Sequence, residues 1–244
     1  ENEMGEDLAF VPLGANRTAT SLSVGENHAC ALLDDGSVKC WGRNNYGQLG
    51  IGNTSTRGDG ANEMGDDLVA VDLGTGRTAI SIEAGATFTC AILDSGVLKC
   101  WGQNNNGQLG QGHNENIGHG PDLDSNGISC HPTLNTDLNT RECNARLGDG
   151  LAAVDLGDGR TAVSVSAGYS STCAILDNGS VRCWGNNQNG RTGLGISSGY
   201  TGDADDEMGD DLATVELGTG RTASSISVGY SHACALLDLS LIHI

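Results

Sequence analysis

Short apolar runs alternate with polar, glycine-bearing connectors along the whole chain. Val, Ile, Leu and Ala recur in runs of strand length, and no run of eighteen apolar residues occurs. This spacing predicts many short β-strands joined by tight turns and no membrane-spanning helix. Where the pattern is clearest, we expect four strands at 68–73, 78–83, 89–93 and 97–101.

The pattern recurs four times. An Arg-Thr-Ala landmark begins at Arg17, Arg77, Arg160 and Arg221, so successive copies are offset by 60, 83 and 61 residues. The longer middle offset reflects an insertion at 113–146. Repeats that cannot each bury an apolar core alone are typical of stacked or radially arranged units.

The connectors between the expected strands favour antiparallel hairpins. Asp34-Asp-Gly36, Asp94-Ser-Gly96 and Asp177-Asn-Gly179 each fit a three-residue loop that ends in a left-handed glycine. Four antiparallel strands per repeat, arranged radially, predict a β-propeller. A β-solenoid is the structural alternative, but its coils usually run nearer about twenty residues per turn.

The segment Cys90-Ala-Ile-Leu-Asp-Ser-Gly-Val-Leu-Lys-Cys-Trp-Gly102, followed by Gly-Gln-Leu-Gly at 107–110, resembles the regulator of chromosome condensation repeat. Trp-Gly recurs at Trp41, Trp101 and Trp184, and these positions indicate packing between blades. The resemblance implies an all-β propeller of four-stranded antiparallel blades. Family propellers have about seven blades, so we expect an open arc of about 3.5 to 4 blades here.

The repeats divide the chain as follows. We expect repeats at 1–61, at 62–147 with the insertion, and at 148–205, then a partial fourth repeat at 206–238. The tail at 239–244 abandons the pattern where a Cys-Trp-Gly is due, and we expect it to be non-native. The first residues already lie inside a repeat, which indicates a fragment.

The chain is strongly acidic, with a formal net charge of −19 and only two lysines. Such a surface repels phosphate backbones, so nucleic acid is disfavoured as a partner. Acidic residues recur in successive copies at Glu63, Asp66, Asp67, Asp205, Asp206, Asp210 and Asp211. We predict that they form a negative ring on one propeller face that binds a basic protein; the alternative is a solvated loop edge.

Regularly spaced cysteines predict cross-strand disulfides. The pairs are Cys30/Cys40, Cys90/Cys100 and Cys173/Cys183. Counting outward from each hairpin loop places the two members opposite each other, at a non-hydrogen-bonded position with Cα atoms about 4.5 Å apart. A further pair, Cys130 and Cys143, is predicted to staple the insertion.

This cysteine content also predicts the compartment. Paired cysteines favour an extracellular or secretory-lumen location. An intracellular location, with the cysteines as small buried apolar residues, is the alternative. Zinc is disfavoured because no Cys-x-x-Cys occurs.

One loop has the opening of a calcium site. Asp122, Asp124 and Asn126 match the Asp-x-Asp-x-Asn-Gly pattern, but the twelfth position is Thr133 and not a bidentate glutamate. The choice is between a weak calcium site and a solvated turn, and no other cofactor is expected.

No catalytic motif accompanies these features. His28 and His232 are replaced by Phe88 and Ser171 in the other copies, which favours a structural role. No nucleophile elbow, Walker loop or dinucleotide fingerprint occurs. We therefore predict a non-enzymatic interaction module that binds a protein through loops on one face, chiefly the insertion. The alternatives are guanine-nucleotide exchange on a small GTPase, as the resemblance implies, and the recognition domain of a larger ligase or kinase.

Overall fold

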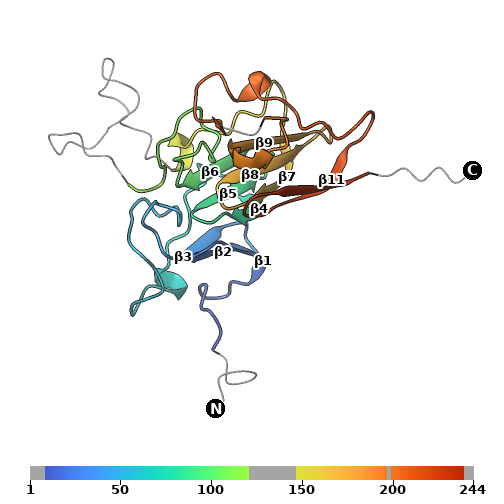
Figure 1. Cartoon of the computed structure of the whole chain (residues 1–244). Coiled ribbons are helices and arrows are strands. Elements are labelled where there is room, and N and C mark those ends of the chain that lie inside the picture. Colours follow the sequence, from blue (N-terminus) through green and yellow to red (C-terminus); the bar gives the residue numbers. More distant parts are fainter. Residues whose placement is uncertain (1–8, 121–146, 197–198, 239–244) are drawn as a thin grey trace, which may run out of the picture.

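The computed structural model describes residues 9–120, 147–196 and 199–238. These residues form four antiparallel sheets, which follow one another in chain order (Figure 1). The first two sheets contain β1 (Ala19–Val24), β2 (His28–Leu33) and β3 (Val38–Gly42), then β4 (Ala79–Ala84), β5 (Phe88–Leu93) and β6 (Leu98–Gly102). The last two contain β7 (Ala162–Ala167), β8 (Ser171–Leu176), β9 (Val181–Asn186) and β10 (Tyr200–Thr201), then β11 (Ala223–Val228) and β12 (Ala233–Leu237).

Among the described residues, the helical turns in the connections are single turns of 3-10 helix. These are η2 (Gly65–Asp67), η4 (Gly148–Gly150), η5 (Gln188–Gly190) and η6 (Gly209–Asp211). Within the described ranges, no helix has the length and apolar character needed to cross a bilayer.

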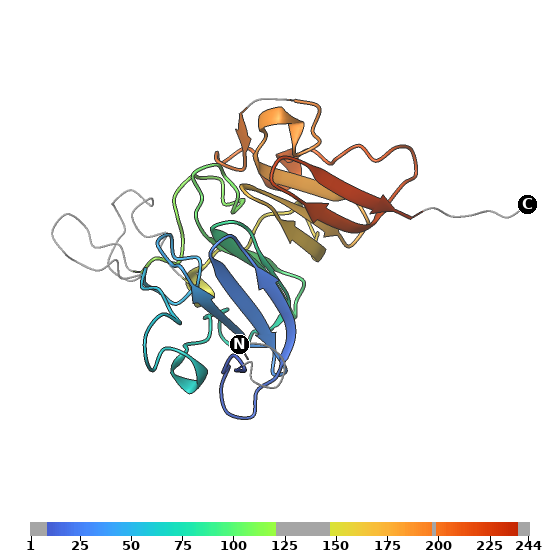
Figure 2. The ribbon, with the colours of Figure 1, turned by 60° about the horizontal axis from the view of Figure 1, so that its bottom comes forward.

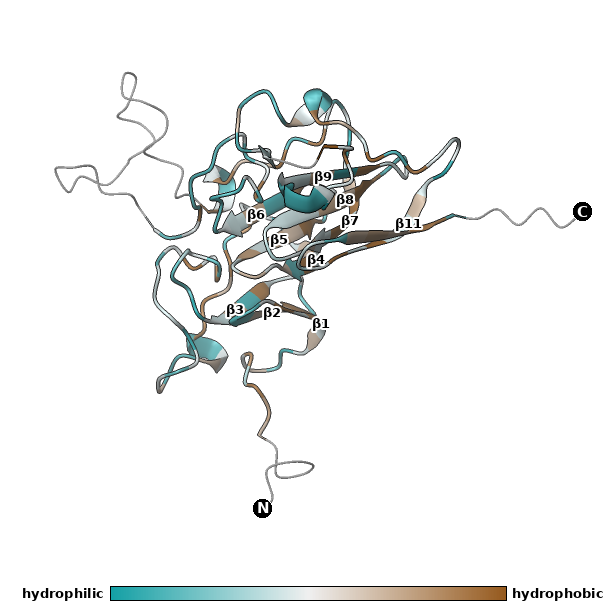
Figure 3. Ribbon diagram, in the orientation of Figure 1, coloured by the Kyte–Doolittle hydropathy of each residue, from teal (hydrophilic) through white to brown (hydrophobic). Residues whose placement is uncertain are grey.

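Each sheet is one blade, and the blades pack face to face in sequence order (Figure 2). Strand β4 contacts β1 and β2 of the blade before it, and β7 and β11 repeat this contact at the next two interfaces. The prediction of an all-β fold with antiparallel blades is therefore confirmed. Hydrophobic residues gather along the strands, and the connecting loops carry most of the hydrophilic colour (Figure 3).

The hairpin loops have the predicted geometry. Leu93 N donates to Val97 O at 2.8 Å, and Gly96 N donates to Leu93 O at 2.9 Å. Gly36, Gly96 and Gly179 all have φ of +78°, a left-handed conformation that glycine adopts without steric cost. The observed strands β4, β5 and β6 begin and end within one residue of the expected ones.

The expectation of a continuous strand at 68–73 is wrong. Only Ala70 forms a bridge there, and its partner is Lys39 in β3 of the preceding blade. The other end of β3 pairs with a second segment, through the bridge between Gly42 and Arg57. Because β3 has five residues and two segments share its outer edge, neither segment extends into a ladder. In the third blade the Arg57 equivalent does extend, as β10 paired with β9.

The interior lies between blades. Ile82 in β4 and Val165 in β7 are only 2% and 4% exposed because the preceding blade covers them. Leu22, at the equivalent place in β1, is 60% exposed. At the other end of the arc Leu236 in β12 is 64% exposed, whereas its equivalent Ile92 is fully buried. The described residues therefore form an arc whose two end faces are open.

Candidate functional site

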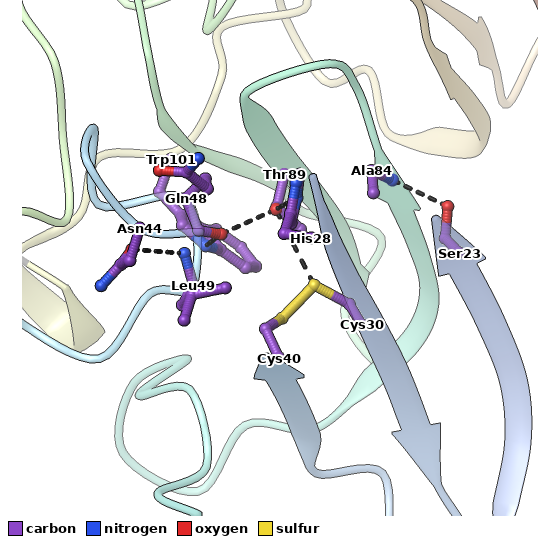
Figure 4. Close-up of a disulfide and its surroundings, with 10 residues drawn as sticks. All are labelled: Ser23, His28, Cys30, Cys40, Asn44, Gln48, Leu49, Ala84, Thr89 and Trp101. Atoms are coloured by element: carbon purple, nitrogen blue, oxygen red, sulfur yellow. Dashed lines mark hydrogen bonds between the residues drawn. A yellow bond between two sulfur atoms is a disulfide. The ribbon is translucent and has the colours of Figure 1, made fainter. Parts of the chain in front are cut away.

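A loop from each blade clamps the next blade. The carbonyl oxygen of Gln48 accepts hydrogen bonds from Thr89 Oγ1 at 2.8 Å and from Trp101 Nε1 at 3.1 Å (Figure 4). Asn44 Oδ1 accepts from the backbone N of Leu49 at 2.9 Å and fixes the shape of that loop. The repeated Asn-x-x-x-Gln-Leu sequence therefore shapes a loop and holds it against the next blade.

Equivalent residues form the same contact between the second and third blades. Gln108 O accepts from Thr172 Oγ1 at 2.8 Å and from Trp184 Nε1 at 3.0 Å. At the third interface Arg191 replaces the glutamine, and its Nη1 donates to Tyr230 O at 3.0 Å. The first two interfaces use a backbone carbonyl, whereas at the third interface the Arg191 side chain contacts the fourth blade, which has Ala233 at the place of Thr89.

Burial of the three tryptophans follows their place in the arc. Trp101 and Trp184 have no exposed surface, and each lies against the loop of the preceding blade. Trp41 is half-buried, since no preceding blade covers it among the described residues.

His28 has a packing role at the first interface. Its Nε2 lies 3.0 Å from Thr89 Oγ1, and its ring lies over Gly25, where a Cβ would come within 2.5 Å of it. Burial lowers the pKa of His28 to about 4, so the ring is neutral at physiological pH. The equivalent Phe88 fills the same space over Gly85.

Disulfides join β2 to β3, β5 to β6 and β8 to β9. The pairs are Cys30–Cys40, Cys90–Cys100 and Cys173–Cys183, with Cα–Cα distances of 4.0, 4.0 and 4.1 Å. The ladder register places the two members of each pair directly opposite each other, so the counting argument is confirmed. Cys234 is an exposed free thiol, while Cys130 and Cys143 lie outside the described residues.

The basic residue before the second cysteine of each pair holds the outer edge of its blade. Lys39 Nζ donates to Gly65 O at 2.7 Å, and Lys99 Nζ donates to Gly148 O at 2.7 Å. Arg182 Nη1 donates to Gly209 O in the third blade. Sequence reasoning missed this role, although the signal was present: both lysines of the chain lie in Lys-Cys-Trp-Gly.

Three of the seven acidic candidates are engaged inside the chain. Glu63 accepts hydrogen bonds from the backbone N of Gly58 and of Gly60, both at 2.9 Å. Asp66 accepts from Ala15 N at 2.8 Å and Asp210 from Asp158 N at 3.1 Å, so these carboxylates hold neighbouring loops.

The other four acidic candidates, Asp67, Asp205, Asp206 and Asp211, are exposed. Their role in binding a basic partner stays a prediction. The calcium candidates Asp122, Asp124 and Asn126 lie outside the described residues, as do residues 121–146 of the insertion that was predicted to bind the partner. Over 9–120, 147–196 and 199–238, no group of three or more His, Cys, Asp or Glu residues could hold a metal ion.

A different surface lies at the opposite end of the blades from the hairpin loops, and we call it the turn-end surface. It is built on the turns between the first two strands of each blade, with Glu26, Ala86, Tyr169 and Tyr230 at equivalent positions. Backbone hydrogen bonds link these turns from blade to blade: Glu26 N to Ala86 O at 3.2 Å, and Ala86 N to Gly168 O at 3.1 Å. The scaffold beneath is regular, but the residues that it presents differ in type.

Family comparisons identify the repeats. Two models of the regulator of chromosome condensation (RCC1) repeat match the chain, one at 19–48, 79–108 and 162–191, the other at 35–92. The ultraviolet-B receptor UVR8 of Arabidopsis thaliana is 29% identical over 194 residues, which are 79% of this chain and 35% of that protein. The human E3 ubiquitin-protein ligase HERC2 is 26% identical over 198 residues, 72% of this chain and 4% of that protein. The chain thus spans about a third or less of these relatives.

Solved structures agree on the fold. Prp20p of Saccharomyces cerevisiae, which binds Gsp1p and histones, matches with a TM-score of 0.59 and 19% identity over 89% of this chain and 43% of that one. Yeast RCC1 (Prp20) bound to Kap60 matches with a TM-score of 0.60 and 18% identity, covering 89% and 41%. At this identity the likeness supports the propeller fold alone.

Proposed function

The chain carries regulator of chromosome condensation repeats, and on that premise we propose that it is a non-enzymatic protein-binding module. Disulfide-stapled blades form the scaffold, and loops on one face bind the partner. The structurally similar yeast Prp20 binds proteins, namely Gsp1p, histones and Kap60, which supports binding of a protein here too.

One observation carries the proposal: the copies agree where they hold the blades together and differ where they present loops. Asn44, Asn104 and Asn187 keep the same loop-shaping role in three blades. Glu26 and Tyr169, at equivalent places on the turn-end surface, have unrelated side chains. A rigid scaffold with individual loops is the arrangement on which binding residues concentrate.

We assign the partner a basic surface, because the chain carries a net charge of −19. The exposed residues Asp67, Asp205, Asp206 and Asp211 would attract such a partner over a distance and speed its approach. Short-range contact would then be made at the turn-end surface.

The compartment that we propose is extracellular or the secretory lumen, where the three disulfides persist. Thiol titration of the natural protein, unfolded without reductant, checks this. We expect the six cysteines of β2–β3, β5–β6 and β8–β9 to be unreactive. A full complement of reactive thiols would contradict an oxidising compartment.

A second candidate is the targeting part of a larger intracellular ligase, favoured by the similarity to HERC2. Nucleotide exchange on a small GTPase is a third. Purified chain that accelerates nucleotide release from a small GTPase would favour exchange over the binding-only proposal.

Site-specific crosslinking tests the proposed function. A photoreactive residue replaces Tyr230 on the turn-end surface or, as the matched control, Asn178 in a hairpin loop; both are exposed. We expect a saturable crosslink to one protein from position 230 and none from 178. The purified partner must then form a stable complex with the chain. Equal, unsaturable crosslinking from both positions, or no complex on reconstitution, would refute the proposal.

A further inference from the structure

The turn-end surface contains a pocket of about 330 Å³ that draws on three blades. Its walls include Glu26, Tyr46, Thr87, Gln103, Asn106 and Tyr169, and we call it the turn-end pocket. A pocket of this size matches one large side chain and lies at the low end of the range for small-ligand sites.

Tyrosines gather at this pocket. The chain has four tyrosines, of which Tyr46 and Tyr169 line it, and Tyr230 packs against Tyr169 with ring centroids 4.2 Å apart. Tyr169 is 42% exposed and Tyr230 is 64% exposed, so part of each ring stays open to a ligand although the two rings pack on each other. Aromatic faces attract cations, above all the planar guanidinium of arginine.

The pocket also carries a carboxylate. No basic side chain among the described residues forms an ion pair with Glu26. The pKa of Tyr169 is raised, first by Tyr230 and then by the Glu26 charge, so the Glu26 carboxylate acts electrostatically on the Tyr169 ring. Its negative charge favours a cation beside that ring.

One positive group, Arg43, also lines the pocket. With the Asn45 amide oriented so that its oxygen faces the guanidinium, Arg43 Nη2 and Nε lie 3.0 and 3.2 Å from that oxygen. Arg43 forms no ion pair with Glu26 in the described part of the chain, so the carboxylate remains able to pair with a further cation.

We propose that the turn-end pocket binds an arginine side chain of the protein partner, stacked on Tyr169 and paired with Glu26. This inference rests on the proposed function and names the group that is recognised. Arginine fits better than lysine because its planar fork stacks on a ring while it donates to a carboxylate. The net charge of −19 on the chain also favours a positively charged ligand.

Two peptides test the recognition step without knowledge of the partner. Both have nine residues of Gly and Ser around one central residue, which is arginine in the first and the neutral isostere citrulline in the second. Amide NMR shifts of the full chain report binding. We expect the arginine peptide to shift Tyr46, Thr87 and Tyr169, and the citrulline peptide to bind at least tenfold more weakly. Equal binding of the two peptides, or shifts confined to the hairpin loops, would overturn the inference.

Matched variants assign the binding to the pocket. Glu26→Gln and Tyr169→Ala should each weaken the arginine peptide about tenfold or more, since a charge-assisted contact or a stacked ring is lost. Glu216→Gln and Tyr200→Ala change an exposed carboxylate and the fourth tyrosine elsewhere and should leave binding unchanged. Unchanged melting temperatures show that all four variants are folded. Unchanged peptide affinity in Glu26→Gln would overturn the inference.

The reconstituted partner separates this inference from the proposed function. If the partner binds the Glu26→Gln variant as tightly as the wild type, recognition of arginine by the pocket is refuted, while the proposal that the chain binds a protein is kept. If a neutral oligosaccharide produces the pocket shifts and the arginine peptide does not, the pocket recognises a sugar and the inference also falls.

Discussion

A few polar residues hold successive blades together from equivalent places. Thr89 and Thr172 each donate to the glutamine carbonyl of the preceding loop, beside a buried tryptophan. The sequence predicted that the tryptophans pack between blades, because Trp-Gly recurs. It could not predict the threonine contacts, because their acceptors are backbone carbonyls 41 and 64 residues away.

At the residue scale, His28 should make stability depend on pH. The pKa of His28 is about 4 in the folded state and 6.5 in the unfolded state. Between these two pH values the imidazole is protonated in the unfolded chain and neutral in the folded chain. Stability is full above pH 6.5 and falls as the pH decreases toward 4, by about 2 kcal/mol at pH 5. Urea unfolding of His28→Phe, a residue that Phe88 shows to be accommodated, should lose this part of the pH dependence. An identical pH profile in the variant would contradict the assignment.

The tryptophans provide a second prediction at this scale. Trp101→Phe removes a hydrogen bond to Gln48 O and leaves space in a fully buried site. We expect it to lower the free energy of unfolding by about 2–4 kcal/mol. Trp41→Phe makes the same chemical change at the half-buried arc end and should cost less than about 1 kcal/mol. Equal losses in urea unfolding would show that the preceding loop does not clamp Trp101.

At the element scale, hairpins were predictable and the outer edges of the blades were not. Turn residues fixed the register of β5 and β6, and so the pairing of Cys90 with Cys100. The expected strand at 68–73 failed because its neighbour, β3, is short and belongs to the preceding copy. Lys39 supports that edge through a side-chain contact with Gly65, which strand periodicity does not reveal.

The disulfides can be tested one hairpin at a time. Replacing Cys90 and Cys100 together by Ala should lower the free energy of unfolding by about 2–3 kcal/mol, because a short loop in the unfolded chain is released. Cys234→Ala, at the exposed free thiol, should change it by less than about 0.5 kcal/mol. Urea unfolding without reductant measures both. A loss below about 1 kcal/mol in the double variant would mean that the bond does not staple the blade.

At the scale of the whole molecule, regular repeats produce an irregular surface. Periodicity predicted four copies and hence a propeller arc. It did not predict the turn-end pocket, because Glu26, Tyr46 and Tyr169 belong to two different copies and meet only when the blades pack. The repeat pattern pointed instead to acidic residues, among them Glu63, whose carboxylate accepts a hydrogen bond within its own loop.

The dissociation rate of the reconstituted complex tests the central claim most directly. One variant combines Glu26→Gln, Tyr46→Ala and Tyr169→Ala in the turn-end pocket; the other combines Asp67→Asn, Asp205→Asn and Asp211→Asn at exposed acidic positions. We expect the pocket variant to dissociate at least tenfold faster, and the acidic variant to associate more slowly with its dissociation rate within about twofold of wild type. Faster dissociation of the acidic variant, with the pocket variant unchanged, would contradict the account.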